Sequence, residues 1–292
     1  MIGLLIIGLA VGLGVGVPTA SSSVPTATNL WQPAVNSSWQ IILSNAISLP
    51  TSAKSVTPNV EIFDIDLFTN TNATIKTLHG LGKKVICYFS AGSYEPGRPD
   101  SSQFNKTDLG KELDGWPGEY WLNLSSSRVR DIMAARIQLA ADKGCDAIDP
   151  DNVDGYNNDN GLSLATDDSI SFINFLSTQA ANHNLSTGLK NAGDIIPSVL
   201  QYVHFSVNEQ CVEYSECSDF APFIQAGKPV FHIEYPDGAP GKLSSATVKK
   251  YCASTGSGDG SKGFSTVLKD MDLDGWVEYC NEEVATTPLD TN

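Results

Sequence analysis

The sequence predicts a single-domain (β/α)8 barrel, also called a TIM barrel, from three observations. Its 292 residues are 41% hydrophobic, which is enough for one large core. Short apolar runs alternate with amphipathic segments, a pattern that predicts parallel strands joined by right-handed crossovers. The apolar runs end in acids and amides, and in a closed barrel such ends meet at one mouth, where barrel enzymes keep their active sites. An open doubly wound sheet would instead scatter them along a crevice.

Nine segments have the composition of strands, although a closed barrel needs eight. The segment YWLNL is the weakest of them and is expected to be a short extra piece. In chain order the nine are WQIIL (39–43), EIFDID (61–66), KVICYFS (84–90), YWLNL (120–124), DAIDPD (146–151), STGLKN (186–191), HFSVNE (204–209), PVFHIEY (229–235) and FSTVLKD (264–270).

Two segments between strands have the period of amphipathic helices. SRVRDIMAARIQLAADKG places an apolar stripe from Val129 to Ala140 on one face, with Ser126 or Ser127 as the N-cap and Gly144 as the stop. The segment TDDSISFINFLSTQAANHN repeats the pattern from Ile170 to Ala180. Both are expected to be crossover helices.

The amino terminus predicts a leader. The first 17 residues contain no polar side chain, and a Pro/Thr/Ser-rich run follows them, so 1–28 is expected to be a signal peptide or signal anchor with this run. No Lys or Arg precedes Lys54, which leaves an uncleaved membrane anchor open. The barrel domain is expected over 29–285, and a tail over 286–292.

Glycosylation sites and cysteines indicate a secreted or cell-surface protein. Cys211 with Cys217, and Cys252 with Cys280, are plausible disulfides, whereas Cys87 and Cys145 are expected to be buried free thiols. Five Asn-x-Ser/Thr sequons occur, at Asn36, Asn72, Asn105, Asn123 and Asn184.

The charge balance excludes one class of partner. A net charge of -15 would repel nucleic acid and attract a polycation, although solubility alone is the simpler explanation. We expect a monomer.

Several motifs fail on inspection. GDGSKG (258–263) precedes a strand instead of opening a helix, so it does not predict a dinucleotide site. DMDLDG (270–275) begins like a calcium loop, but Asn281 stands where the loop needs Glu. The four histidines form no metal-binding pair. We therefore expect no metal and no cofactor.

Carboxylates remain as the candidate chemistry. Asp149 and Asp151 share one strand face by the two-residue period, and Glu209 follows Asn208 at another strand end. One Asp and one Glu across a barrel mouth suit glycosidic cleavage, in which one carboxyl protonates the leaving oxygen and the other attacks or activates water. A binding protein that does not cut its polysaccharide, and a metal-dependent hydrolase using Asp149, Asp151 and Asp154, are the alternatives.

The blocks FDIDLF, VICYFSAGSYE, GCDAIDPDNVDGY, GLKNA and FSVNEQCVEY occur in this order. Together they resemble glycoside hydrolase family 114, the endo-α-1,4-polygalactosaminidases, from Trp31 to Cys280. The resemblance implies a (β/α)8 barrel that cuts α-1,4-linked galactosamine in exopolysaccharide, such as the galactosaminogalactan of filamentous fungi. It also implies Asp151 and Glu209 as the catalytic pair. By analogy with retaining enzymes, Asp151 would be the nucleophile and Glu209 the acid/base.

A galactosamine polymer without acetyl groups is cationic, so the resemblance implies that the negative charge of this protein attracts its substrate. Crowded acids would also raise the pKa of a catalytic acid. Where related sequences often show Trp-Leu-Asp-Ile, this chain has WLNLSSS, with Asn123 inside a sequon. If Asn123 is glycosylated, it cannot also lie in the substrate cleft. Trp121 and Tyr156 are further candidates for sugar stacking. The expected substrate-binding residues are Asp64, Asp66, Tyr88, Asp149, Asp154, Lys190, Asn208, Glu234 and Tyr235.

Overall fold

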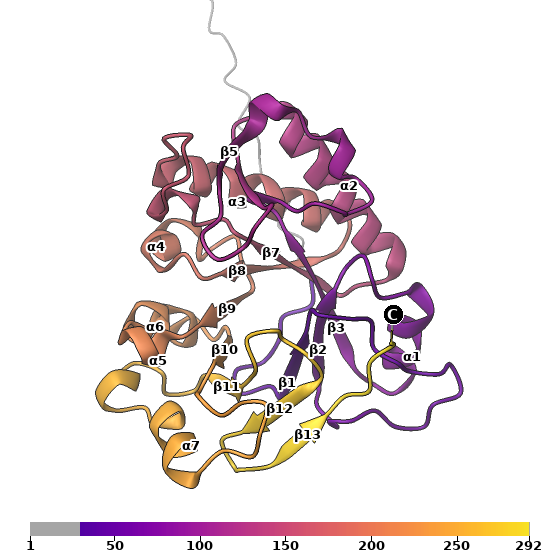
Figure 1. Ribbon diagram of the computed structural model, residues 1–292, viewed down its shortest axis with the longest axis vertical. Coiled ribbons are helices and arrows are strands. Elements are labelled where there is room, and N and C mark those ends of the chain that lie inside the picture. Colours follow the sequence, from indigo (N-terminus) through magenta and orange to yellow (C-terminus); the bar gives the residue numbers. More distant parts are fainter. Residues whose placement is uncertain (1–29, 292) are drawn as a thin grey trace, which may run out of the picture.

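The computed structural model describes residues 30–291, and the expected leader over 1–28 lies outside them. A curled ten-stranded sheet forms the centre of the molecule (Figure 1). In spatial order its strands are β1 (Trp39–Ile42), β2 (Ile62–Asp66), β3 (Lys84–Ser90), β7 (Ala147–Asp151), β8 (Ser186–Lys190), β9 (Phe205–Glu209), β10 (Val230–Glu234), β11 (Ser265–Leu268), β12 (Trp276–Tyr279) and β13 (Val284–Thr286).

The first eight strands of this sheet, β1 to β11 in spatial order, all pair in parallel. They coincide with eight of the nine expected segments. The ninth, YWLNL, contains β6 (Tyr120–Leu122), which lies between β4 (Ser93–Tyr94) and β5 (Leu109–Glu112) in a separate small sheet. The expectation that YWLNL is an extra piece is therefore confirmed.

Seven helices lie along the outer side of the curled sheet in the described chain (Figure 1). The expected stripe of α2 is buried, and the helix begins after Ser126, whose side chain accepts a hydrogen bond from the backbone of Val129. It ends at Gly144, where φ is 90°. The helices are α1 (Asn72–Gly80), α2 (Ser127–Lys143), α3 (Thr166–Asn182), α4 (Ile196–Val199), α5 (Cys211–Tyr214), α6 (Cys217–Gln225) and α7 (Ser245–Cys252). None of these helices is long and apolar enough to cross a membrane.

The sheet differs from the expected barrel where it would close. In the described residues no strand ladder joins β11 to β1, and the antiparallel strands β12 and β13 continue the sheet instead. Side chains bridge part of the gap: Trp39 Nε1 donates to the carbonyl of Ser265 at 2.7 Å, and the buried Lys269 donates to Gln40 Oε1 at 3.1 Å. The structure thus supports a curled, parallel-rich sheet, and full closure stays a prediction.

All six cysteines form disulfides: Cys87–Cys145, Cys211–Cys217 and Cys252–Cys280. The expectation of free thiols at Cys87 and Cys145 was therefore wrong. Cys87 lies on β3 and Cys145 lies two residues before the start of β7, and these strands are neighbours although 58 residues separate the two cysteines.

Candidate active site

Three neighbouring strands end in polar side chains at one edge of the sheet. Asp151 ends β7, Lys190 ends β8 and Glu209 ends β9. The next residue in each case has a left-handed backbone, with φ of 60° at Asn152, 47° at Asn191 and 60° at Gln210. Non-glycine residues adopt this conformation at a cost of roughly 1 kcal/mol or more, and such residues cluster at functional sites.

Lys190 joins the two carboxylates that the sequence predicts as the catalytic pair. Its Nζ lies 3.1 Å from Oδ2 of Asp151 and 3.2 Å from Oε2 of Glu209. The Lys190 side chain is buried, whereas 16% of the Asp151 side chain and 24% of the Glu209 side chain are exposed. The ammonium therefore sits below two carboxylates that both reach the solvent.

Asp151 is held by donors on two further sides. The hydroxyl of Tyr88 donates to its Oδ2 at 2.8 Å, and the backbone of Asn152 donates to its Oδ1 at 2.7 Å. Burial raises the pKa of Tyr88 well above its usual value, and the negative charge of Asp151 raises it further. Tyr88 therefore remains a hydrogen-bond donor throughout the pH range of enzyme activity.

Glu209 accepts hydrogen bonds from Asn191 Nδ2 at 3.1 Å and from the hydroxyl of Tyr235. Burial alone would raise the pKa of Glu209, but the Lys190 ammonium and the donated hydrogen bonds outweigh it and lower the pKa. This differs from the expected upward shift at a catalytic acid. Glu209 is ionised in the free site.

Asp64, on β2, and Asp149, on β7, have no exposed surface. Burial raises the pKa of Asp64 well above its usual value, and the negative charge of Asp149 raises it further. Burial also raises the pKa of Asp149 to about 7, where Lys190 opposes the rise and Asp151 adds to it. Since both carboxyls are fully buried, neither side chain is placed to touch a sugar.

Three other expected substrate-binding residues are also buried: Asp66, Asn208 and Glu234. Asp66 Oδ2 pairs with Arg98 at 2.7 Å, and Glu234 Oε1 accepts the backbone N–H of Val212 at 2.7 Å. Asn208 is buried, and neither polar atom of its side chain has a hydrogen-bond partner in the part of the chain that the structure describes. We assign these residues to support of the site instead of direct contact with substrate.

Two adjoining cavities open at this edge of the sheet. The larger, which we call the main cavity, has a volume of about 560 Å³ and contains Asp151, Tyr88, Lys190 and Tyr235 among its lining residues. The smaller, the side cavity, measures about 300 Å³. Four residues line both cavities and join them into one groove: Asp154, Asn191, Glu209 and Gln210.

Asp154 lines both cavities and so faces this groove. Burial raises its pKa to about 6, and the negative charge of Asp151 contributes to the rise. Of the other candidates, Trp121 lines the main cavity, whereas Tyr156 and Asn123 line neither cavity.

Sequence reasoning missed the segment between β3 and β6, which supplies one wall of the main cavity. Arg98 and Glu119 lie on this wall, and burial raises the pKa of Glu119 to about 7. The strands β4 and β5 are too short to produce a detectable period, so the only signal available was the run of aromatic and acidic residues from Glu112 to Trp121.

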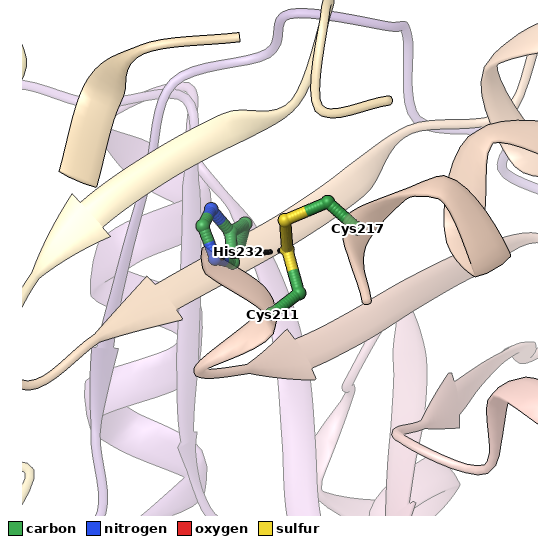
Figure 2. A group of neighbouring side chains, drawn as sticks. All are labelled: Cys211, Cys217 and His232. Atoms are coloured by element: carbon green, nitrogen blue, oxygen red, sulfur yellow. Dashed lines mark hydrogen bonds between the residues drawn. A yellow bond between two sulfur atoms is a disulfide. The ribbon is translucent and has the colours of Figure 1, made fainter. Parts of the chain in front are cut away.

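The disulfide Cys211–Cys217 holds the chain that follows Glu209. Figure 2 shows His232 beside this disulfide, with Nε2 at 3.3 Å from Sγ of Cys211. Within the described chain, these three residues form the single group of potential ligands close enough to hold a metal ion. Sulfurs bonded to each other are not the thiolates that zinc requires. The group therefore fits a structural role.

Comparison with known proteins gives three findings. The model of the glycoside hydrolase family GH114 matches residues 20–285. The crystal structure of Aspergillus fumigatus Ega3 in complex with galactosamine is 55% identical, and the match covers 86% of this chain and 97% of that chain with a TM-score of 0.79. The glycoside hydrolase domain of PelA from Pseudomonas aeruginosa is 11% identical, covers 87% of this chain and 99% of that chain with a TM-score of 0.60, and shares the fold. No curated protein matches the chain.

Proposed function

The chain belongs to glycoside hydrolase family GH114, and from this premise we propose that Asp151 and Glu209 cleave α-1,4 bonds within galactosamine-rich polysaccharide. The protein is accordingly a glycosidase, an endo-α-1,4-polygalactosaminidase. The observation that carries the residue assignment is the single Lys190 ammonium between the two partly exposed carboxylates.

In the proposed mechanism Asp151 attacks the anomeric carbon while Glu209 donates a proton to the departing glycosidic oxygen. A covalent glycosyl ester forms on Asp151. Water then attacks the anomeric carbon and loses its proton to Glu209, which releases the sugar with its original anomeric configuration.

The spacing of the carboxylates supports retention. Because one ammonium contacts both, their nearest oxygens are no further apart than two hydrogen-bond lengths placed end to end. Retaining enzymes hold their carboxyls about 5 to 5.5 Å apart, whereas inverting enzymes need about 6.5 to 9.5 Å to admit a water. NMR of the first anomer released tests this assignment, and initial formation of the β-anomer would contradict it.

The lowered pKa of Glu209 sets a condition on the acid step. Glu209 has to gain a proton before it can donate one, so the Lys190 contact has to weaken when substrate enters, or catalysis has to favour acidic pH. Asp154, with its pKa near 6, is the alternative proton donor in the groove.

Product release from deacetylated α-1,4-galactosamine polymer tests these assignments. We expect oligosaccharides from the wild type and losses of several orders of magnitude in Asp151→Asn and Glu209→Gln. If Asp154→Asn is as inactive as Glu209→Gln, the acid role moves to Asp154. A wild type that binds the polymer and releases nothing would favour the non-catalytic polysaccharide-binding alternative.

We further infer that the protein acts outside the cell. Three disulfides fit an oxidising compartment, and four of the five sequon asparagines are exposed. Mass spectrometry of secreted protein before and after removal of N-glycans tests this inference.

A further inference from the structure

Exposed hydrophobic side chains gather in the active-site groove. Among the described residues four large hydrophobic side chains are exposed: Trp116 (56%), Tyr214 (66%), Met271 (52%) and Val284 (39%). Trp116 and Met271 line the main cavity and Tyr214 lines the side cavity, so only Val284, on β13, lies outside the groove.

Trp116 occupies a turn that presents it to the groove. The turn connects β5 to β6, and Gly115 and Gly118 flank Trp116 with φ of 82° and 88°. The backbone N–H of Trp116 donates to the carbonyl of Leu113, and its carbonyl accepts from Glu119. The ring adds little to the core at this exposure, so packing alone does not account for it.

Tyr214, in the side cavity, is also held in place by the local backbone. It ends the short helix α5, which the Cys211–Cys217 disulfide anchors at its start, and Ser215 follows it with φ of 61°. The disulfide thus holds the position of Tyr214 as well as the chain that follows Glu209.

Acidic residues line the cavities beside Trp116 and Tyr214, and they favour a positively charged sugar chain as the ligand of the groove. Asp114 and Asp272 line the main cavity with Trp116 and Met271. Asp194, Glu216 and Asp219 line the side cavity with Tyr214, and no Lys or Arg lines that cavity. Aromatic faces stack on the apolar faces of pyranose rings, and carboxylates attract the ammonium groups of galactosamine. A neutral sugar chain would not need the acids.

Resting on the proposed function, we propose that Trp116 and Tyr214 are sugar-stacking residues at the two ends of one groove, and that they hold galactosamine units on opposite sides of the scissile bond. Glu209 lines both cavities, whereas Trp116 lines only the main cavity and Tyr214 only the side cavity. This arrangement needs a chain longer than the two sugars that are separated, and so it favours cutting within long polymers.

The test compares Trp116→Ala, Tyr214→Ala and the double variant with Val284→Ala, which removes an exposed hydrophobic side chain outside the groove. kcat and KM are measured on deacetylated polymer and on short oligosaccharides of defined length. Each groove variant should lower the ratio of kcat/KM on polymer to that on short oligosaccharides by about 5- to 10-fold, through a higher KM on polymer. Val284→Ala should keep the wild-type ratio.

A ratio unchanged in both groove variants would overturn the proposal. An equal fall of kcat on short and long substrates would also overturn it, because that result indicates damage to the catalytic centre. Direct binding of the same variants to immobilised polymer separates this proposal from the proposed function. If the wild type binds the polymer without cutting it, and Trp116→Ala and Tyr214→Ala both bind the polymer more weakly than the wild type, the sugar-stacking assignment holds and the enzymatic assignment fails.

Discussion

The hydroxyl of Tyr88 lies 2.8 Å from Oδ2 of Asp151, the same oxygen that contacts the Lys190 ammonium at 3.1 Å. Tyr88 lies on β3 and Asp151 on β7, where the two strands pair in parallel. Oδ2 of Asp151 thus contacts both a neutral hydrogen-bond donor and a cation. These two contacts fix the orientation of the Asp151 carboxylate where it faces the groove.

Tyr88→Phe should lower kcat by about 10- to 100-fold, because a hydrogen bond to a charged group contributes about 1.5 to 3 kcal/mol. The fold should persist, since the ring remains. Steady-state kinetics and thermal unfolding of the same preparation check both statements. Tyr156→Phe is the matched control, because the Tyr156 hydroxyl has no hydrogen-bond partner within residues 30–291 and Tyr156 lines neither cavity. Equal activity of the two variants would contradict a positioning role for Tyr88.

Lys190→Met should change the pH profile as well as the rate. The Lys190 ammonium lowers the pKa of Glu209, so its removal raises that pKa. If Glu209 is the acid, the fall of kcat/KM at high pH should then move to higher pH, while kcat falls at every pH. Profiles of kcat/KM against pH test this.

Lys111→Met is the control for Lys190→Met, because it removes the same charge from an exposed ion pair with Asp159. It should leave the profile in place. A Lys190→Met profile that keeps its high-pH limb would instead indicate that a group other than Glu209 donates the proton.

Asp154 predicts a pH dependence of substrate affinity. Its pKa of about 6 means that the carboxyl is neutral below pH 6 and negative above it. A negative Asp154 attracts the ammonium of galactosamine, so KM for deacetylated polymer should fall as pH rises through 6. Asp154→Asn should flatten this change in KM. A variant that keeps the wild-type slope would exclude Asp154 as the titrating group.

The eight parallel strands could be predicted because most of them are buried apolar runs that end in a polar residue, as β7 does at Asp151 and β9 at Glu209. Of the antiparallel strands only β6 was predicted. The strand β12 was missed because it is defined by its pairing with β11, and β4 was missed because it has only two residues. The same limit applies to closure of the barrel, which depends on contacts such as Trp39 with Ser265 instead of on any local pattern.

The candidate site, too, could be predicted from the sequence only in part. The two-residue period places Asp149 and Asp151 on one face, but it does not give their depth in the barrel. Asp151 reaches the groove and Asp149 has no exposed surface. The sequence likewise showed that Lys190 lies at a strand end. It did not show that Lys190 contacts both Asp151 and Glu209, because this depends on how three strand ends are arranged in space.

Removal of the two buried disulfides should have different effects: loss of Cys87–Cys145 should mainly lower stability, and loss of Cys211–Cys217 should mainly lower activity. Cys87–Cys145 spans 58 residues and Cys211–Cys217 spans 6, so loop entropy predicts contributions of about 4 and about 2 kcal/mol to the free energy of unfolding. Replacing both cysteines of a pair with Ala should therefore lower Tm more for Cys87–Cys145. The kcat of the folded enzyme should fall more for Cys211–Cys217, because Cys211 lies two residues after Glu209 and the loop carries Tyr214.

Thermal unfolding and kinetics well below Tm measure the two effects independently. Each double-Ala variant is a control for the other, since both lose one disulfide and differ in its distance along the chain from Glu209. If Cys87→Ala/Cys145→Ala lost more kcat than Cys211→Ala/Cys217→Ala, the short disulfide would not be the element that positions Glu209. A larger Tm loss on opening the short loop would instead show that native packing around Cys211 outweighs the entropy of the longer loop.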